Sequence, residues 1–349
     1  MVPITNPPPD KPVEGKPVEG KPVEPVEVEL AEALPTPQAK PLARVTKLAL
    51  RIVPLVLLVA AVFVLRREFK GLSWDAVGKA MDGWGHLAII AALVLAVLSF
   101  LLMGVVEWLG LRWAGAKLPW GVAVAGSFLA GAIGHAIGAN LLVAGAVRAR
   151  LYDRYGVTLT QVAVTTLFNG MSFAVGLGAL GGGGLLLASQ AELAATAIPV
   201  SLARSAGAVL LAGSLGWVLL CMVRRRPLSA FGRSLTLPAG RDAVLQLIIG
   251  VADNGIAAGI VWVLLPHGTT SYASFVGAYA VACVAGLISS VPGGAGVFES
   301  AISTLLPKAE AAPLAAAFLG YRLAYYLLPL IIASAALFGD TLLERLRKR

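Results

Sequence analysis

The residues of this chain that could do chemistry are few, and the most informative of them follow a helix break. An apolar run ends at Pro292, Gly293 and Gly294, and Gly296 and the acid Glu299 come directly after it. Proline removes a helical donor and glycine frees the backbone, so a helix should stop here. At membrane depth such a break survives only where protein or a wet cavity surrounds it. The segment therefore predicts a binding or transport site.

Other polar side chains interrupt the apolar runs, and we predict that they bind a lipid headgroup. An ionised side chain at mid-bilayer costs roughly 2.5–3.5 kcal/mol, so such a residue normally faces a wet cavity or a partner. The Arg322 guanidinium could hold a phosphate through paired donors, with neighbouring tyrosines adding hydrogen bonds. The predicted headgroup ligands are Asn140, Arg148, Arg150, Asn169, Asp253, Glu299, Arg322, Tyr325 and Tyr326. The predicted breaks or hinges are Gly138, Pro292, Gly293, Gly294 and Gly296.

These residues also have a purely structural interpretation, which the sequence leaves open. Glu299 could cap a helix or pair with Arg322. Asp253 could pair with Arg204 or Arg322. Ordinary loop positivity, or hydrogen bonds between helices, would equally explain Arg148, Arg150, Asn140 and Asn169.

Catalysis is the competing class of function. The sequence contains no nucleophile elbow, no zinc-ligand pair at helical spacing and no phosphate-binding loop, so we expect no catalytic residue, metal or cofactor. An intramembrane lipid-modifying enzyme could still use Glu299 and Asp253 as acid and base. A third alternative is an accessory or scaffold subunit of a lipid-synthesis system. Movement of labelled phospholipid between leaflets without chemical change would distinguish translocation from both.

Composition indicates what kind of secondary structure carries these residues. Of 349 residues, 58% are hydrophobic and only 13% are charged, against roughly 25% charged in a soluble domain. A single soluble core is therefore excluded. The net charge of +9 lies mostly on loops between apolar runs, where it orients spans and touches anionic lipid rather than nucleic acid. Cys221 and Cys283 lie in apolar surroundings and predict no disulfide or metal framework.

The apolar stretches predict an all-α polytopic membrane protein. A spanning helix needs roughly 20 apolar residues. The stretches are 48–65, 87–107, 119–147, 161–188, 197–222, 243–265, 272–306 and 311–338. Stretches 119–147 and 272–306 contain breaks, so we expect about six full transmembrane helices plus two re-entrant or broken helical hairpins. Residues 129–133 loosely resemble 284–288, which suggests an inverted pseudo-repeat.

The first 43 residues differ from the rest of the chain. A Lys-Pro-Val-Glu-Gly unit occupies residues 11–15 and recurs at 16–20. Such a charged, proline-rich segment has little apolar surface to bury. We therefore divide the chain into a disordered tail, residues 1–43, and a transmembrane domain, residues 44–349.

Loop charges predict the orientation in the membrane. Basic residues gather at 148–154, 224–226 and 345–349, whereas the loops at 190–192 and 266–268 lack Lys and Arg. By the positive-inside rule the C-terminus is cytoplasmic, and the N-terminus is cytoplasmic too if 119–147 enters and returns on one side. If 119–147 crosses fully, the N-terminus moves outside.

Several separated motifs together resemble one family. They are residues 138–140, 145–152, Asn169, 290–299 and 321–326, and the likeness extends from about residue 48 to about 340. In this order they resemble the membrane domain of lysylphosphatidylglycerol synthase/flippase proteins. In that family the membrane domain is associated with moving aminoacylated phospholipid between leaflets, and a separate soluble domain performs aminoacyl transfer.

The resemblance implies translocation or lipid binding without synthesis, because the chain stops at Arg349 soon after its last apolar run. Combined with the polar residues, it predicts a flippase-like protein of the inner membrane. The lipid headgroup would be bound in a cavity between the two hairpins. The expected partners are membrane phospholipids, a separate lipid synthase or further copies of the chain.

Overall fold

The computed structural model describes residues 73–346, apart from 138–139, 197, 225–227, 231–232, 236 and 290. All described residues belong to one unit within 39–349. The predicted tail, residues 1–43, and the apolar stretch 48–65 lie outside the described residues, as do Arg347, Lys348 and Arg349.

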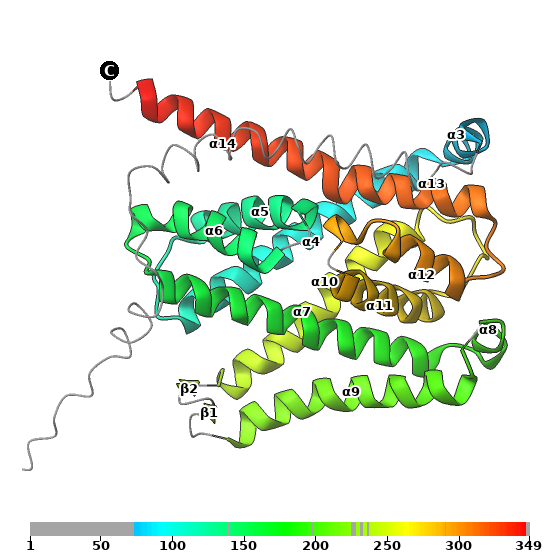
Figure 1. Cartoon of the computed structure of the whole chain (residues 1–349), viewed down its shortest axis with the longest axis horizontal. Helices are drawn as coiled ribbons and strands as arrows, with labels where there is room; N and C mark the ends of the chain where they lie inside the picture. Colours follow the sequence, from blue (N-terminus) through cyan, green and yellow to red (C-terminus); the bar gives the residue numbers. More distant parts are fainter. Residues whose placement is uncertain are drawn as a thin grey trace, which may run out of the picture. The chain divides into compact units, whose positions relative to one another are not determined.

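The described fold is built from α-helices, as expected (Figure 1). The helices are α3 (Trp74–Asp82), α4 (His86–Trp113), α5 (Trp120–Ile137), α6 (Asn140–Tyr152), α7 (Leu159–Leu187), α8 (Gln190–Ala194), α9 (Val200–Val223), α10 (Gly240–Trp262), α11 (Tyr272–Ser289), α12 (Val297–Leu305), α13 (Ala311–Arg322) and α14 (Leu328–Leu346). Short 3₁₀ turns cover Asp153–Tyr155 and Pro292–Gly294, and a π-helical turn, Leu323–Leu327, joins α13 to α14. An antiparallel hairpin of β1 (Leu228–Ala230) and β2 (Arg233–Leu235) adds a small non-helical element.

Six described helical segments are long and apolar enough to cross a membrane. They are His86–Trp113, Leu159–Leu187, Val200–Val223, Gly240–Trp262, Tyr272–Ser289 and Ala311–Leu337. Five of them coincide with predicted full spans. The sixth is α11, the first arm of a predicted hairpin, while the remaining predicted span, 48–65, is outside the described residues. The multi-pass helical fold is confirmed.

The two predicted hairpins are present, and they face opposite ways. Helix α5 packs on α6 and α11 packs on α12. At about 1.5 Å per residue, α6 is roughly 20 Å long and α12 roughly 14 Å, too short to cross a hydrocarbon core of about 30 Å. In Figure 1 the α5–α6 hairpin opens to the left and the α11–α12 hairpin opens to the right. Their closed ends meet, because the Pro292–Gly294 turn contacts α5.

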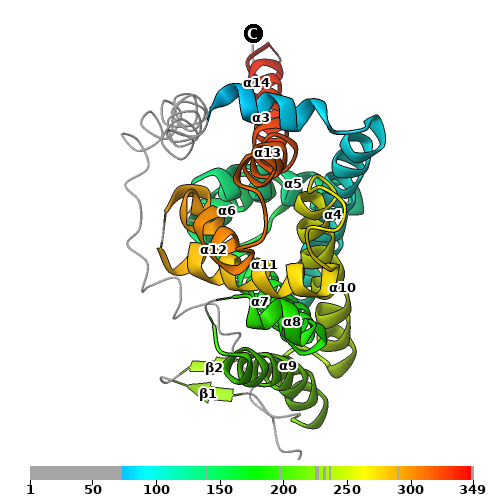
Figure 2. The same cartoon turned by 90° about the vertical axis from the view of Figure 1, so that its right-hand side faces the viewer.

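Helix α7 is the central support of both hairpins. It contacts α6 and α11, and also α4, α9 and α10. Seen along the bundle, α7 lies between α9 on one side and α10 and α11 on the other (Figure 2). Close approach requires glycine: a Cβ on Gly176 would lie 2.1 Å from the carbonyl carbon of Gly250 on α10.

The two ends of the bundle collect the loops that the charge pattern assigned to opposite sides. Helix α8 and the turn between α10 and α11 lie at one end, which we call the α8 end (Figure 1). The C-terminal ends of α6 and α9 and the β-hairpin lie at the other. The separation matches the predicted loop grouping, and which end is cytoplasmic stays a prediction.

Candidate functional site

A fully buried carboxylate ties the first hairpin to α4. Glu107, on α4, has no exposed surface. The Arg148 guanidinium, on the short arm α6, donates from Nε to Oε1 at 2.8 Å and to Oε2 at 2.9 Å. Its Nη2 also lies 2.8 Å from Oε2. The short arm is therefore held by a buried, bidentate ion pair, a strong type of polar contact.

Two further donors complete the coordination of Glu107. The Tyr152 hydroxyl donates to Oε1 at 2.9 Å, and Asn169 Nδ2, on α7, donates to Oε2 at 2.6 Å. A Cβ on Gly126 would lie 2.2 Å from the Tyr152 hydroxyl oxygen, so glycine at this position leaves room for the ring. Asn169 Oδ1 is buried and has no hydrogen-bond partner among the described residues. We call Glu107, Arg148, Tyr152 and Asn169 the Glu107 cluster.

A second ion pair holds the opposite hairpin. Arg322, at the end of α13, donates from Nε to Glu299 Oε1 at 2.8 Å, and its Nη2 lies 2.5 Å from the same oxygen. The other carboxylate oxygen accepts the Gly296 backbone N–H at 2.8 Å and caps α12. The guanidinium carbon lies 5.6 Å from the Tyr326 ring centroid. Both structural roles considered for Glu299, the cap and the pair, are present.

The break that precedes Glu299 depends on left-handed backbone. Gly293 and Gly294 both have φ of 61°, and Gly296 has φ of 83°. Side chains larger than hydrogen rarely adopt these values, so glycine permits the chain to leave α11 and start α12 in a few residues. A Cβ on Gly293 would lie 3.4 Å from Arg322 Nη1. The tip of the hairpin thus rests against the second ion pair.

Asp253 forms a third polar group near the middle of the bundle. It accepts a hydrogen bond from the Ser99 hydroxyl, and Ser99 Oγ lies 2.8 Å from the Tyr325 hydroxyl. Within the described part of the chain Asp253 has no ion pair. Arg204, which we had considered as its partner, instead donates to the backbone carbonyls of Leu186 and Ala188.

Aromatic rings lie between the hydrogen-bonded residues Asp253, Ser99 and Tyr325 and the hairpin tips. His135, on α5, has its ring centroid 5.6 Å from that of Tyr325 and 6.0 Å from that of Tyr326. Its Nδ1 is buried and unpartnered among the described residues. The π-helical turn Leu323–Leu327 aims both tyrosines at this region, and such turns are frequent at functional sites.

The structure divides the predicted ligands among these groups. Arg148 and Asn169 share Glu107, Glu299 and Arg322 pair beside Tyr326, and Asp253 reaches Tyr325 through Ser99. Arg150 is exposed on α6. The Asn140 side chain and Gly138 lie outside what the structure describes.

Glu107 is the residue that the sequence interpretation missed. It is an acid inside the first described span, so the cost of an ionised side chain at membrane depth already signalled it. Ser99 and Tyr152 carried no such signal, because hydroxyls are unremarkable in apolar helices. No cluster of three metal-binding side chains occurs in the part of the chain that the structure describes.

Fold and site together define a multi-pass helical membrane protein with two opposed broken hairpins, one held by a buried ion pair and the other by a part-buried one. Residues 51–333 match the family described as the lysylphosphatidylglycerol synthase TM region, and the chain belongs to this family. This confirms the resemblance drawn from the motifs.

Two relatives match most of the chain. The protein slr0712 of Synechocystis sp. is 29% identical over 308 residues, which make up 88% of this chain and 96% of that protein. The inner membrane protein YbhN of Escherichia coli is 27% identical over 298 residues, or 82% of this chain and 91% of the relative.

Proposed function

We propose that the protein is a flippase-like lipid translocase of the inner membrane. It binds phospholipid headgroups between the two hairpins and helps them cross the bilayer. The observation that carries this proposal is two ion pairs, the buried Glu107–Arg148 pair and the part-buried Glu299–Arg322 pair. Each joins the short arm of one hairpin to a longer neighbouring segment. Membership of the family and the name of the Escherichia coli relative support the membrane location.

Energetics favour a functional reason for these ion pairs. The desolvation of two charges can exceed their mutual attraction, so a buried ion pair is weak evidence for stability alone. A lipid headgroup can supply alternative partners for both charges. Its phosphate can bind the arginine, and an ammonium group, where the headgroup has one, can bind the glutamate. Exchange of partners between Glu299 and a phosphate at Arg322 would free the second hairpin without leaving Arg322 unpaired.

Lipid modification is the alternative function. An acid–base reaction would need Glu299 and Asp253 to act on one substrate. Glu299 is bonded to Arg322 and to the cap of α12, whereas Asp253 is bonded to Ser99. This division between two groups supports translocation over catalysis.

Reconstitution tests the proposal. Purified protein in liposomes should accelerate movement of fluorescent phosphatidylglycerol or phosphatidylethanolamine between leaflets, measured by a membrane-impermeant quencher. Lipid recovered afterwards should be chemically unchanged. Rates equal to those of protein-free liposomes for both lipids would refute translocation, and altered lipid would favour the enzyme alternative.

A further inference from the structure

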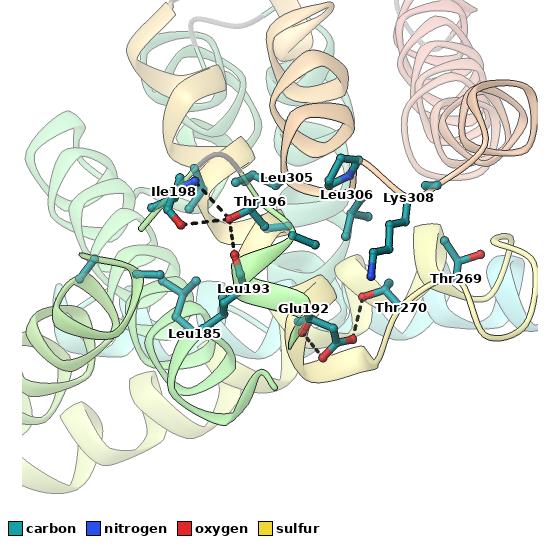
Figure 3. Close-up of a pocket in the computed structure, with 18 of the residues that line it drawn as sticks. Leu185, Glu192, Leu193, Thr196, Ile198, Thr269, Thr270, Leu305, Leu306 and Lys308 are labelled. Atoms are coloured by element: carbon teal, nitrogen blue, oxygen red, sulfur yellow. Dashed lines mark hydrogen bonds between the residues drawn. The ribbon is translucent and has the colours of Figure 1, made fainter. Parts of the chain in front are cut away.

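A cavity at the α8 end stands apart from the three polar groups. Its volume is about 200 Å³, and it lies among the ends of α7, α8, α9 and α12 and the turn before α11 (Figure 3). Apolar side chains from several of these elements form its walls, among them Leu185, Leu193, Ile198 and Leu306. The volume is below the roughly 300–1,000 Å³ of sites for whole drug-sized ligands, so the cavity suits one end of a longer apolar molecule.

An open groove continues from the cavity along α12. The groove has a volume of about 730 Å³ and is lined by α12, by Val281 of α11 and by the hairpin tip before α12. Cavity and groove share Ile198, Val281 and Leu305. The groove extends to Gly296, whose N–H is capped by Glu299. An apolar path therefore joins the α8 end to the tip of the second hairpin.

Among its described residues, the cavity lining includes the acid Glu192 and the lysine Lys308. Glu192 accepts hydrogen bonds from the Ser271 N–H at 2.9 Å, the Ser274 hydroxyl at 2.7 Å and the Ser189 hydroxyl at 2.8 Å. Lys308 is exposed and has no ion pair with any described residue. Figure 3 shows its amine directed toward Thr270, beside Glu192. Serine and backbone donors bind the acid's oxygens and no ion pair with a described residue holds the Lys308 amine, so this amine can bind a ligand.

We propose that the cavity and groove bind an acyl chain of an anionic phospholipid, with its phosphate at Lys308. The apolar walls match the acyl chain of such a lipid, and the Lys308 amine matches its phosphate. The cavity is also open to the surface of the bundle at α9, where the lining residue Leu202 is 59% exposed. The proposal deepens the proposed function by naming where its substrate class binds, but it concerns binding and does not require transport.

Photolabelling in nanodiscs tests this site. The probe is phosphatidylglycerol with a photoreactive diazirine on one acyl chain. Label should appear on peptides from the start of α9 and from α12 to Lys308. Ala206→Trp, which fills the cavity from α9, should lower labelling of these peptides at least tenfold. Val209→Trp is the matched control, because Val209 is 71% exposed on the same helix and does not line the cavity.

The headgroup contact has its own pair of variants. Lys308→Gln should weaken labelling about fivefold, the size expected of an exposed ionic contact. Lys117→Gln, an exposed lysine that does not line the cavity, should leave labelling unchanged. Competition distinguishes lipid from free phosphate: unlabelled phosphatidylglycerol should displace the probe, and glycerol 3-phosphate should not.

The outcomes separate this proposal from the proposed function. Equal labelling of Ala206→Trp and Val209→Trp, with both proteins monodisperse, would overturn it, as would full displacement by glycerol 3-phosphate. If Ala206→Trp aggregates, Leu202→Trp takes its place. Site-specific labelling by a protein that does not move lipid in liposomes would refute translocation and leave the binding site standing.

Discussion

The carboxylate of Glu299 binds Arg322 through one oxygen and caps α12 through the other. The ion pair and the restart of the helix after the break are thus one structure. A change at Arg322 must be felt at the tip of the hairpin, since the residue that holds the guanidinium also holds the Gly296 N–H.

Breaking this pair should separate its structural from its functional role. Arg322→Ala leaves Glu299 without its cation and should cost roughly 3–5 kcal/mol of stability, seen as a lower melting temperature in detergent. The double variant Glu299→Gln with Arg322→Met should regain most of that stability, because glutamine can still accept the Gly296 N–H.

The double variant should not move lipid between leaflets, because it has no guanidinium to bind a phosphate and no carboxylate for the phosphate to replace. A double variant that folds and transports at the wild-type rate would show that Glu299 and Arg322 have only a structural role.

Two arginines of α6, one buried in the Glu107 cluster and one exposed, allow a matched comparison of variants. Arg148→Ala removes the cation that pairs with the buried Glu107 carboxylate and should destabilise the protein by about 3–5 kcal/mol. Arg150→Ala, on the exposed face of α6, should change stability by no more than about 0.5 kcal/mol. Thermal unfolding of both variants in one detergent makes the comparison, and equal melting temperatures would show that the buried pair is dispensable.

Asp253 should tolerate loss of its charge better than Glu299 does. An asparagine can still accept from Ser99, and no described cation would be left unpaired, so Asp253→Asn should change stability by about 1 kcal/mol or less. We expect slower lipid movement in liposomes, as for a headgroup ligand. Unchanged transport by a well-folded Asp253→Asn protein would remove Asp253 from the site.

Low pH should reduce the stability of the α8 end. Burial raises the pKa of Glu192, but hydrogen bonds from Ser271, Ser274 and Ser189 outweigh it and lower the pKa to about 2 from its ordinary 4.5. Because the folded-state pKa is depressed, these bonds contribute their full stability above about pH 4.5. The contribution is lost as the pH falls toward 2. Glu192→Gln should flatten the dependence of melting temperature on pH between 2 and 5, and an unchanged dependence would contradict this account.

Topology can be tested with single cysteines after Cys221 and Cys283 are replaced. Ala191→Cys and His267→Cys, at the α8 end, should react with an impermeant thiol reagent added outside intact cells. Leu228→Cys and Arg347→Cys should react only after permeabilisation. Labelling of Arg347→Cys from outside would reverse the predicted orientation.

Several features were predictable because they depend on neighbouring residues alone. The lengths of the apolar runs predict the helices, and the proline and glycines at 292–296 predict the break, since both follow from local hydropathy and backbone freedom. The breaks within 119–147 and 272–306 predicted the two hairpins for the same reason. The motifs at 138–140, 145–152, Asn169, 290–299 and 321–326 were sufficient to indicate the family.

Which polar groups meet could be learned only from the folded structure. Glu107 binds Arg148 across 41 positions, and Ser99 bonds Asp253 across 154. Helices in a membrane are apolar on most faces, so hydropathy does not reveal which face turns inward. That choice depends on where backbones approach most closely, as at Gly176 and Gly250, and such contacts arise only when distant helices pack.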